Sequence, residues 1–190
     1  RIYVGRMEYQ LELFDVDKSD LQIKDEVNIY LDYLQTPNEA FSGMPVCPFL
    51  KAELQSYKLM IEVWRPGEKP LNELWRKFFD SDFNSALFIC VDTEELKWKD
   101  VPRDAYQKSI QGFLKNWSDE SKKYKAILFS PFEERTAAGE PTRKKSPYFL
   151  INVATREELH LSHTKLLDSK YFDNFSKKEL KKLKVKKDKK

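Results

Sequence analysis

Ala86-Leu87-Phe88-Ile89-Cys90-Val91 is an unbroken apolar run near the middle of the 190-residue chain. A continuous run of this length, ended here by Asp92, is typical of a strand that is buried on both faces of a sheet covered by helices. The run therefore predicts the central part of an α/β layer fold. Cys90 lies inside the run, and we expect it to be structural.

Patterned segments flank this strand along the chain. Residues 58–64 alternate as a strand, and residues 70–79 carry apolar side chains at helical spacing. Downstream, Pro102 begins a long helix, and residues 125–129 form another apolar strand. Helical crossovers of this length imply neighbouring parallel strands joined with right-handed geometry.

The remaining segments complete the order of elements. Residues 20–35 show helical periodicity, a short helix follows Cys47, and residues 148–153 form a strand. Capping boxes at 155–158 and 176–179 open two further helices. We predict an α/β fold with a mixed sheet of four or five strands and flanking helices. Its order is helix, helix, strand, helix, strand, helix, strand, strand, helix, with the last two strands antiparallel.

The composition is compatible with one domain that has a real core. Hydrophobic residues make up 41% of the chain and aromatic residues 14%. We assign 1–175 to a single α/β domain, in which 1–18 forms an N-terminal strand or arm, and 176–190 to a basic helix or tail. No run of 18 apolar residues is present, so the sequence predicts no membrane span.

The net charge of +3 is unevenly distributed. Residues 177–190 hold nine lysines against Glu179 and Asp188, so the rest of the chain is acidic overall. An acidic body argues against nucleic-acid binding outside the lysine-rich tail. The chain has only two cysteines, which make no disulfide framework, and we expect reduced thiols and a cytoplasmic location.

Cys47 is the candidate catalytic residue. Proline is favoured at the first position of a helix, so Cys47-Pro48 predicts a helix with Cys47 as its N-cap. The helix dipole would favour the reactive thiolate there. The alternative is a core cysteine packed between Val46 and Phe49. A redox motif is not indicated, because Leu50 stands where a resolving cysteine would be.

The polar loop 133–145 is the best candidate for ligand binding, because α/β proteins bind ligands on loops at strand ends. Its arginines could clamp a carboxylate or phosphate through paired hydrogen bonds. The alternative is an ordinary surface loop. The candidate substrate-binding residues are Arg135, Arg143, Lys145, Ser146 and Tyr148.

The only two histidines, His160 and His163, are three residues apart and share one helix face. With Cys47 or Glu157 they could contribute to a zinc site. They supply two of four ligands and lack a His-Glu-x-x-His motif, so we predict no metal site and favour a structural pair. The chain contains no P-loop, no Gly-x-Gly-x-x-Gly and no Gly-x-Ser-x-Gly motif.

Two motifs resemble those of a bacterial domain family of unknown function, over about residues 21–168. Residues 46–52, Val-Cys-Pro-Phe-Leu-Lys-Ala, are similar to the family's Cys-Pro-Phe-Ala-Lys signature. Residues 145–148, Lys-Ser-Pro-Tyr, stand where the family has Asn-Arg-Ser-Pro-Tyr-Pro. Ser130 replaces the histidine of the family's Phe-His-Pro motif, so any chemistry of that histidine would be missing here. The Cys-Pro pair also resembles that of heme-dependent N-oxygenases.

Three functions are compatible with these patterns. The first is a small-molecule-binding α/β protein, with or without enzymatic activity, that takes an anionic substrate near Cys47 and the 133–148 loop. The alternative is a non-catalytic interaction module that uses the aromatic helix at 70–79 and the basic tail. A further alternative is a heme or metal protein using His160 and His163. The sequence implies no particular cofactor and leaves the oligomeric state open.

Overall fold

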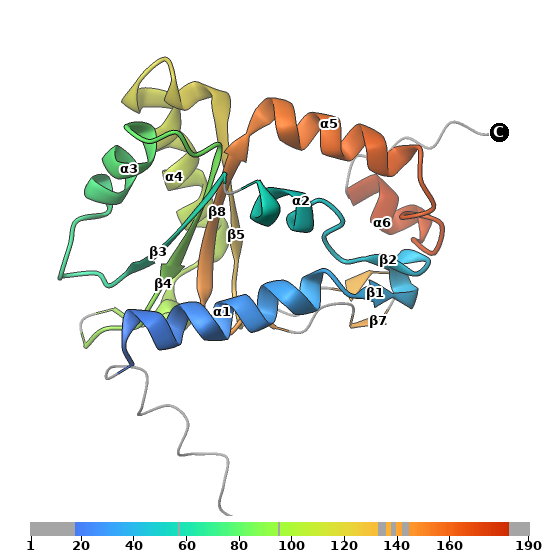
Figure 1. Cartoon of the computed structure of the whole chain (residues 1–190), viewed down its shortest axis with the longest axis horizontal. Helices are drawn as coiled ribbons and strands as arrows, with labels where there is room; N and C mark the ends of the chain where they lie inside the picture. Colours follow the sequence, from blue (N-terminus) through green and yellow to red (C-terminus); the bar gives the residue numbers. More distant parts are fainter. Residues whose placement is uncertain are drawn as a thin grey trace, which may run out of the picture.

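The computed structural model describes residues 18–56, 58–94, 96–132, 136–137, 140–141 and 145–182, with 136–137, 140–141 and 182 described by their backbone alone. Its centre is a four-stranded mixed sheet in the order β3-β4-β8-β5 (Figure 1). These strands are β3 (Leu59–Trp64), β4 (Ser85–Cys90), β5 (Tyr124–Phe129) and β8 (Phe149–Thr155). The predicted mixed α/β fold is confirmed.

The strand order corrects one prediction. β3 and β4 are parallel neighbours, as their connection through one helix implied. β4 and β5 run in the same direction, but they are not neighbours, because β8 lies between them and is antiparallel to both. β8 is buried over most of its length, whereas β5 exposes Lys125. The more apolar strand therefore takes the inner position, and the strand with a charged residue takes the edge.

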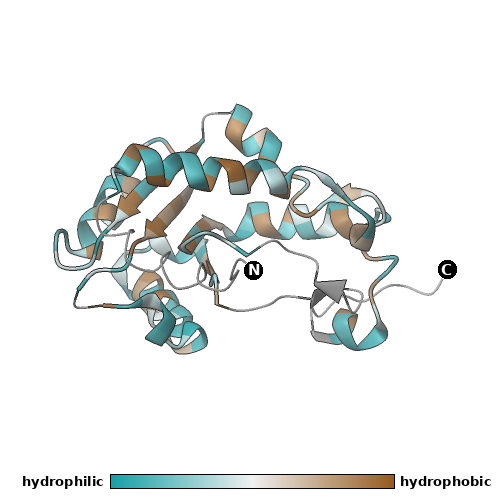
Figure 2. Cartoon of the chain, turned by 90° about the horizontal axis from the view of Figure 1, so that it is seen from below, coloured by the Kyte–Doolittle hydropathy of each residue, from teal (hydrophilic) through white to brown (hydrophobic). Residues whose placement is uncertain are grey.

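Two helices cover one face of the sheet, α3 (Leu71–Phe79) and α4 (Arg103–Trp117). They pack their apolar stripes onto the strands, and Figure 2 shows hydrophobic and hydrophilic residues on different sides of the helices. A short 3-10 helix, η2 (Trp98–Asp100), joins this layer. The core between these helices and the sheet contains the following large, fully buried side chains: Trp75, Phe78, Phe88, Leu114, Leu128, Phe149 and Ile151.

The other face is covered by α1 (Asp20–Leu34), α2 (Leu50–Gln55) and α5 (Arg156–Leu167), and α6 (Lys177–Lys182) lies on the same side, farther from the sheet. The periodicity predicted for α1 is confirmed, since its buried residues are Ile23, Val27, Tyr30, Leu31 and Leu34. These side chains pack against the strand side chains on this face of the sheet. They also join an aromatic group formed by Phe41, Tyr171, Phe172 and Phe175. The result is a three-layer α/β/α arrangement (Figure 1).

A compact turn connects α1 to α2. β1 (Pro37–Asn38) and β2 (Met44–Pro45) pair antiparallel around the 3-10 helix η1 (Glu39–Phe41). Ser42 and Gly43 have positive φ angles of 56° and 78°, which reverses the chain. Glycine adopts this conformation at no steric cost. The two-stranded β6 (Thr136–Ala137) and β7 (Glu140–Pro141) lie within the predicted 133–145 loop, and η3 (Ser121–Lys123) precedes β5.

Side chains cap three of the helices. The amide of Glu158 donates to Thr155 Oγ1 at 3.1 Å, and the amide of Glu179 donates to Ser176 Oγ at 3.3 Å. The predicted N-caps Thr155 and Ser176 are therefore confirmed. Ser19 forms a further capping box with Gln22 at the start of α1. Within the described ranges, every helix is too short or too polar to cross a bilayer.

Candidate functional site at the carboxyl edge of the sheet

Three strands end, and the fourth begins, at one end of the sheet. The register pairs Trp64 with Cys90, Cys90 with Phe149, and Phe129 with Leu150. We call this end the carboxyl edge. Open α/β sheets bind ligands outside the carboxyl ends of their parallel strands. The carboxyl edge is therefore the first place to look for a site.

A network of three side chains joins α1 to the start of β8 at this edge. The hydroxyl of Tyr148 donates to Glu26 Oε2 at 2.6 Å. Lys18 Nζ lies 2.9 Å from Glu26 Oε1 and donates to Glu26 Oε2 at 3.1 Å. Lys18 also lies 3.5 Å from the Tyr148 hydroxyl and 6.0 Å from the centre of its ring. We call Lys18, Glu26 and Tyr148 the edge network.

The edge network keeps Glu26 ionised. Partial burial on its own would raise the pKa of Glu26. The hydrogen bonds from Tyr148 and Lys18, together with the positive charge of Lys18, outweigh that effect and lower this pKa from its ordinary value of 4.5. A charge-assisted hydrogen bond from a nearly buried tyrosine fixes the position of both groups. The edge therefore presents an oriented, polar surface.

The structure describes three of the five predicted ligand-binding residues. Ser146 is buried, and its hydroxyl donates to the Tyr148 carbonyl at 2.6 Å, so it orders the approach to β8. Lys145 is exposed beside it. Tyr148 belongs to the edge network. Arg135 and Arg143 lie outside the described residues.

Arg65 fixes the start of α1 to the end of β3. Its guanidinium pairs with Asp20 and donates through Nη2 to the Lys18 carbonyl at 2.9 Å. Arg65 is mostly buried, with 16% of its side chain exposed. A buried fork of this kind holds its acceptors in one geometry. Lys18 is thus held at the carboxyl edge twice. Arg65 binds its backbone carbonyl, and Glu26 binds its side chain.

Replacing Tyr148 with Phe tests the edge network. Glu26 is partly exposed, so we expect a loss of about 1 kcal/mol in unfolding free energy at pH 7. A lowered folded-state pKa contributes stability above the unfolded value and loses it as pH falls through the folded value. The difference between wild type and Tyr148→Phe should therefore shrink below pH 4.5. Urea titrations across pH measure this.

A double-mutant cycle with Glu26→Gln supplies the control. If the two side chains act together, the cost of Tyr148→Phe should fall to a few tenths of a kcal/mol or less in the Glu26→Gln background. An equal cost in both backgrounds, or no dependence on pH, would contradict the network.

Cys47 lies elsewhere, and the helix predicted at Cys47-Pro48 starts later than expected. α2 begins at Leu50 with Phe49 as its N-cap, so Cys47 is not the N-cap and Pro48 is not the first helical residue. The amide of Glu53 donates to the Phe49 carbonyl at 3.2 Å, which makes Phe49 the cap, while the Cys47 amide is bonded to the Leu34 carbonyl at 2.9 Å. That bond holds Cys47 in the preceding turn. A six-residue helix that starts beyond the thiol gives no basis for helix-dipole activation.

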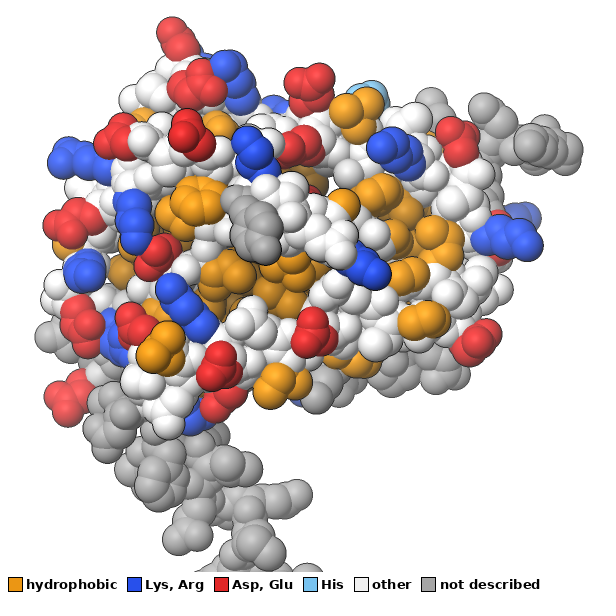
Figure 3. All heavy atoms as spheres, viewed as in Figure 1, with side chains coloured by type: hydrophobic (Ala, Val, Ile, Leu, Met, Phe, Trp, Pro, Cys, Tyr) orange, Lys and Arg blue, Asp and Glu red, His pale blue; other side chains and the backbone are white. Residues whose placement is uncertain are grey.

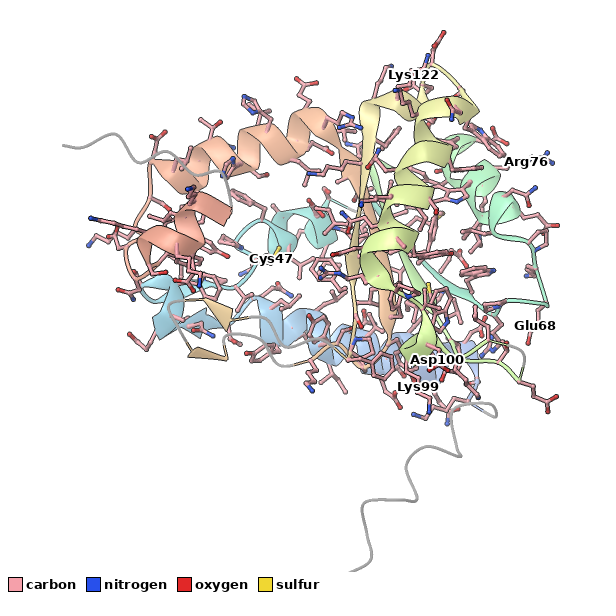
Figure 4. All side chains as sticks on the ribbon, turned by 180° about the vertical axis from the view of Figure 1, so that it is seen from behind. Cys47, Glu68, Arg76, Lys99, Asp100 and Lys122 are labelled. Carbon is pink, nitrogen blue, oxygen red and sulfur yellow. The ribbon has the colours of Figure 1, made fainter. Side chains whose placement is uncertain are left out.

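Cys47 is also separated from the edge network. Its amide meets the C-terminal end of α1 at Leu34, whereas Glu26 is two turns earlier. At 1.5 Å per residue, these points are about 12 Å apart along the helix axis. Figure 4 shows Cys47 between α2 and β2, well away from Lys99 and Asp100 of η2. The structure therefore does not bring Cys47 together with Tyr148.

The two thiols differ in burial. Cys90 is 1% exposed, as predicted for a structural residue, and burial raises the pKa of its thiol. Cys47 is half-buried and packs against the α1 layer. Iodoacetamide should therefore label Cys47 in the native protein at least about 100-fold faster than Cys90. Mass spectrometry of tryptic peptides measures both rates.

The matched control is Cys47→Ser, which should leave no thiol that reacts before denaturant is added. Rapid native labelling of Cys90 would contradict the burial of β4.

Both histidines lie on α5. His160 is exposed, and His163 packs edge-on against Phe172 with ring centroids 6.2 Å apart. Across the described residues, no group of three or more His, Cys, Asp or Glu side chains could hold a metal ion. His163 thus has a packing role in the described structure.

The interaction hypothesis depends on the aromatic helix at 70–79, which is α3, and on the basic tail. In α3, Leu74, Trp75 and Phe78 are buried against the sheet, so these side chains are not presented to a partner. α6 carries the first lysines of the basic tail, and residues 183–190 lie outside the described part.

A second group of titratable side chains lies at the opposite end of the sheet. Burial raises the pKa of Glu53 on α2, and the negative charge of Glu158 raises it further. Burial also raises the pKa of Tyr124, which pairs with Thr155 at this end, and Glu120 and Glu158 add to the effect. The same end also carries the basic residues Lys122 and Lys123 of η3.

Comparison with known proteins adds no relatives. No family model, curated protein or solved structure matches the chain. The resemblance to the bacterial domain family therefore stays an expectation from the motifs.

Sequence reasoning missed two members of the edge network, Lys18 and Glu26. Both belong to the polar side or the approach of α1, and their partner Tyr148 is more than 120 positions away. No spacing rule connects residues so distant. The Glu26 side chain is 39% exposed, so the helical pattern of α1 does not set it apart from the other polar residues of that helix.

Proposed function

We propose that this chain is a small-molecule-binding protein whose ligand carries a carboxylate or phosphate group and docks at the carboxyl edge. The observation that carries the proposal is the edge network of Lys18, Glu26 and Tyr148. It supplies a fixed polar surface at the end of the sheet where α/β folds bind ligands.

The charge arrangement supports an anionic ligand. Lys18 compensates the charge of Glu26, so the network as a whole does not repel an anion. Lys145 is exposed next to the network, and the adjoining segment contributes Arg135 and Arg143 in sequence. Lysine and arginine are the usual partners of carboxylates and phosphates.

The proposal requires binding and leaves covalent chemistry at Cys47 aside. Cys47 is far from the edge network along α1, so a ligand at the carboxyl edge would not meet its thiol. The tyrosine hydroxyl already donates to Glu26, and the lysine already pairs with it. Their role in this proposal is to position the ligand-facing surface.

Calorimetric titration of the full chain with pyrophosphate and with citrate tests the proposal. We expect saturable binding that weakens about fivefold in Lys145→Ala, since one exposed charge contact is worth about 1 kcal/mol. Arg135→Ala and Arg143→Ala should weaken binding further.

Lys122→Ala is the control, because Lys122 is also exposed but precedes β5 at the opposite end of the sheet. It should bind like the wild type. Equal losses in Lys145→Ala and Lys122→Ala would mean diffuse charge attraction, and the proposal would then fail.

A further inference from the structure

The two edges of the sheet are treated differently. At the β5 edge, the amides of Ala126 and Leu128 donate to the side chains of Gln111 and Gln107, at 3.4 and 3.3 Å. These glutamines of α4 occupy donors that would otherwise be unpaired. At the β3 edge, no strand and no side chain bonds to the outward backbone groups of β3 within the described part of the chain. An open edge is a template for another strand.

The β3 edge is also apolar. Leu59, Ile61 and Val63 face the α1 layer and are only half-buried. Figure 3 shows hydrophobic side chains in a hollow of this surface, in the region between α1 and α2. An extended segment that paired with β3 could place every second side chain in this hollow.

Two ion pairs involve the side chain of Glu62 on β3. Glu62 is bound by Lys77 of α3 at 2.5 Å, and Lys24 of α1 reaches it from the other face at 4.0 Å. The longer contact is a partly exposed pair of the kind that contributes little to stability. Compared with the glutamines at β5, it leaves the backbone of β3 accessible.

The chain itself contains a fitting strand. Met7-Glu8-Tyr9-Gln10-Leu11-Glu12-Leu13 alternates strictly between apolar and polar residues. This pattern is typical of a strand with one buried face. Its apolar side chains match the row of β3 in the hollow. Its two glutamates would lie on the side of α3, which carries Lys77.

The position of Lys18, to which this segment is attached, bears on whether the segment pairs with β3 of its own chain or of a second copy. Arg65 holds the Lys18 carbonyl next to the end of β3, so a strand formed by the residues before Lys18 on the same β3 would finish at the carboxyl end of β3 and run parallel to it. Within one chain, the segment would be connected to β3 through α1, which lies on one face of the sheet. β3 is connected to β4 through α3, which lies on the other face. The two crossovers would have opposite hands, which sheets avoid. Pairing between two copies is free of this constraint.

We infer that residues 7–13 of one copy add as a strand to the β3 edge of a second copy, and that the chain forms a dimer by exchanging these arms. Main-chain hydrogen bonds to β3 provide the affinity. The apolar row in the hollow between α1 and α2 sets the register.

Sedimentation of the full chain over a range of concentrations, together with hydrogen exchange of the β3 amides, tests this inference. The wild type should be a concentration-dependent dimer with protected amides in β3. Leu11→Asp should raise the dissociation constant at least about tenfold and speed exchange in β3 by a similar factor, because a charge cannot enter the hollow. Circular dichroism of Leu11→Asp should show that the α/β domain stays folded.

Gln10→Asp places the same charge on the opposite face of the arm and should remain a dimer. A wild type that is monomeric at every concentration would overturn the inference. Within that outcome, β3 protection that depends on Leu11 would mean that the arm docks on its own chain. Protection that is independent of Leu11 would mean that the arm does not occupy the edge.

Discussion

Replacing Trp75 with Ala should cost about 3–5 kcal/mol of unfolding free energy. Trp75 is 1% exposed and contacts Phe88 edge-on, with ring centroids 4.9 Å apart. It also contacts Phe79 and Phe113, at 5.9 and 5.7 Å, and thus joins α3, α4 and β4. The substitution leaves a cavity at this junction. A domain of this kind is stable by about 5–15 kcal/mol, so the loss is a large fraction of the total.

Urea denaturation followed by circular dichroism measures this loss. Trp117→Ala is the matched control, because Trp117 belongs to the same aromatic group but is only half-buried. We expect it to cost less than about half as much. Equal costs for the two tryptophans would mean that α3 is not packed as described.

Trp98→Ala should have a similarly large effect, about 3–5 kcal/mol, and should also disturb the carboxyl edge. Trp98 is 2% exposed and stacks on Phe149 with ring centroids 4.7 Å apart. Its indole donates to the Val91 carbonyl at 3.0 Å, and its amide donates to Asp92 at 2.8 Å. It therefore fixes the chain that leaves β4 next to the start of β8.

Trp98→Phe separates the two parts of this effect. It retains most of the packing but leaves the Val91 carbonyl without the indole, and we expect a cost of about 1–2 kcal/mol. If the account is right, Trp98→Ala lowers the affinity for pyrophosphate measured at a temperature where the protein is still folded, and Trp98→Phe does so less. If Trp98→Ala is destabilised but binds pyrophosphate with unchanged affinity, η2 does not contribute to the site.

Local patterns predicted the elements well, because each strand and helix is fixed by its own periodicity. Leu59, Ile61 and Val63 share one face of β3, as their alternation indicated, and the stripe of α3 is buried. The place of β8 was harder. The antiparallel arrangement predicted for the last two strands is confirmed by β5 and β8. Nothing in the sequence indicates that β8 also pairs with β4, because a crossover helix fixes the relative direction of two strands without excluding a third between them.

The candidate site was only partly predictable. The strand-end position of Tyr148 could be recognised, since it directly precedes an apolar strand. Its partner Glu26 could not, because the two meet only when α1 crosses the end of the sheet. The N-cap position predicted for Cys47 was wrong, because a Cys-Pro pair fits both a helix start and the turn before one. The hydrogen bond from Cys47 to Leu34 decides for the turn, and it depends on a long-range contact.

The most direct test of the binding proposal is a nuclear magnetic resonance titration of the full chain with pyrophosphate, which follows every assigned backbone amide. We predict that the largest saturable shifts fall at Lys18, Lys145, Ser146 and Tyr148, around the edge network. Shifts centred on Cys47 and α2, on the lysines of α6, or spread without saturation would contradict a ligand site at the carboxyl edge.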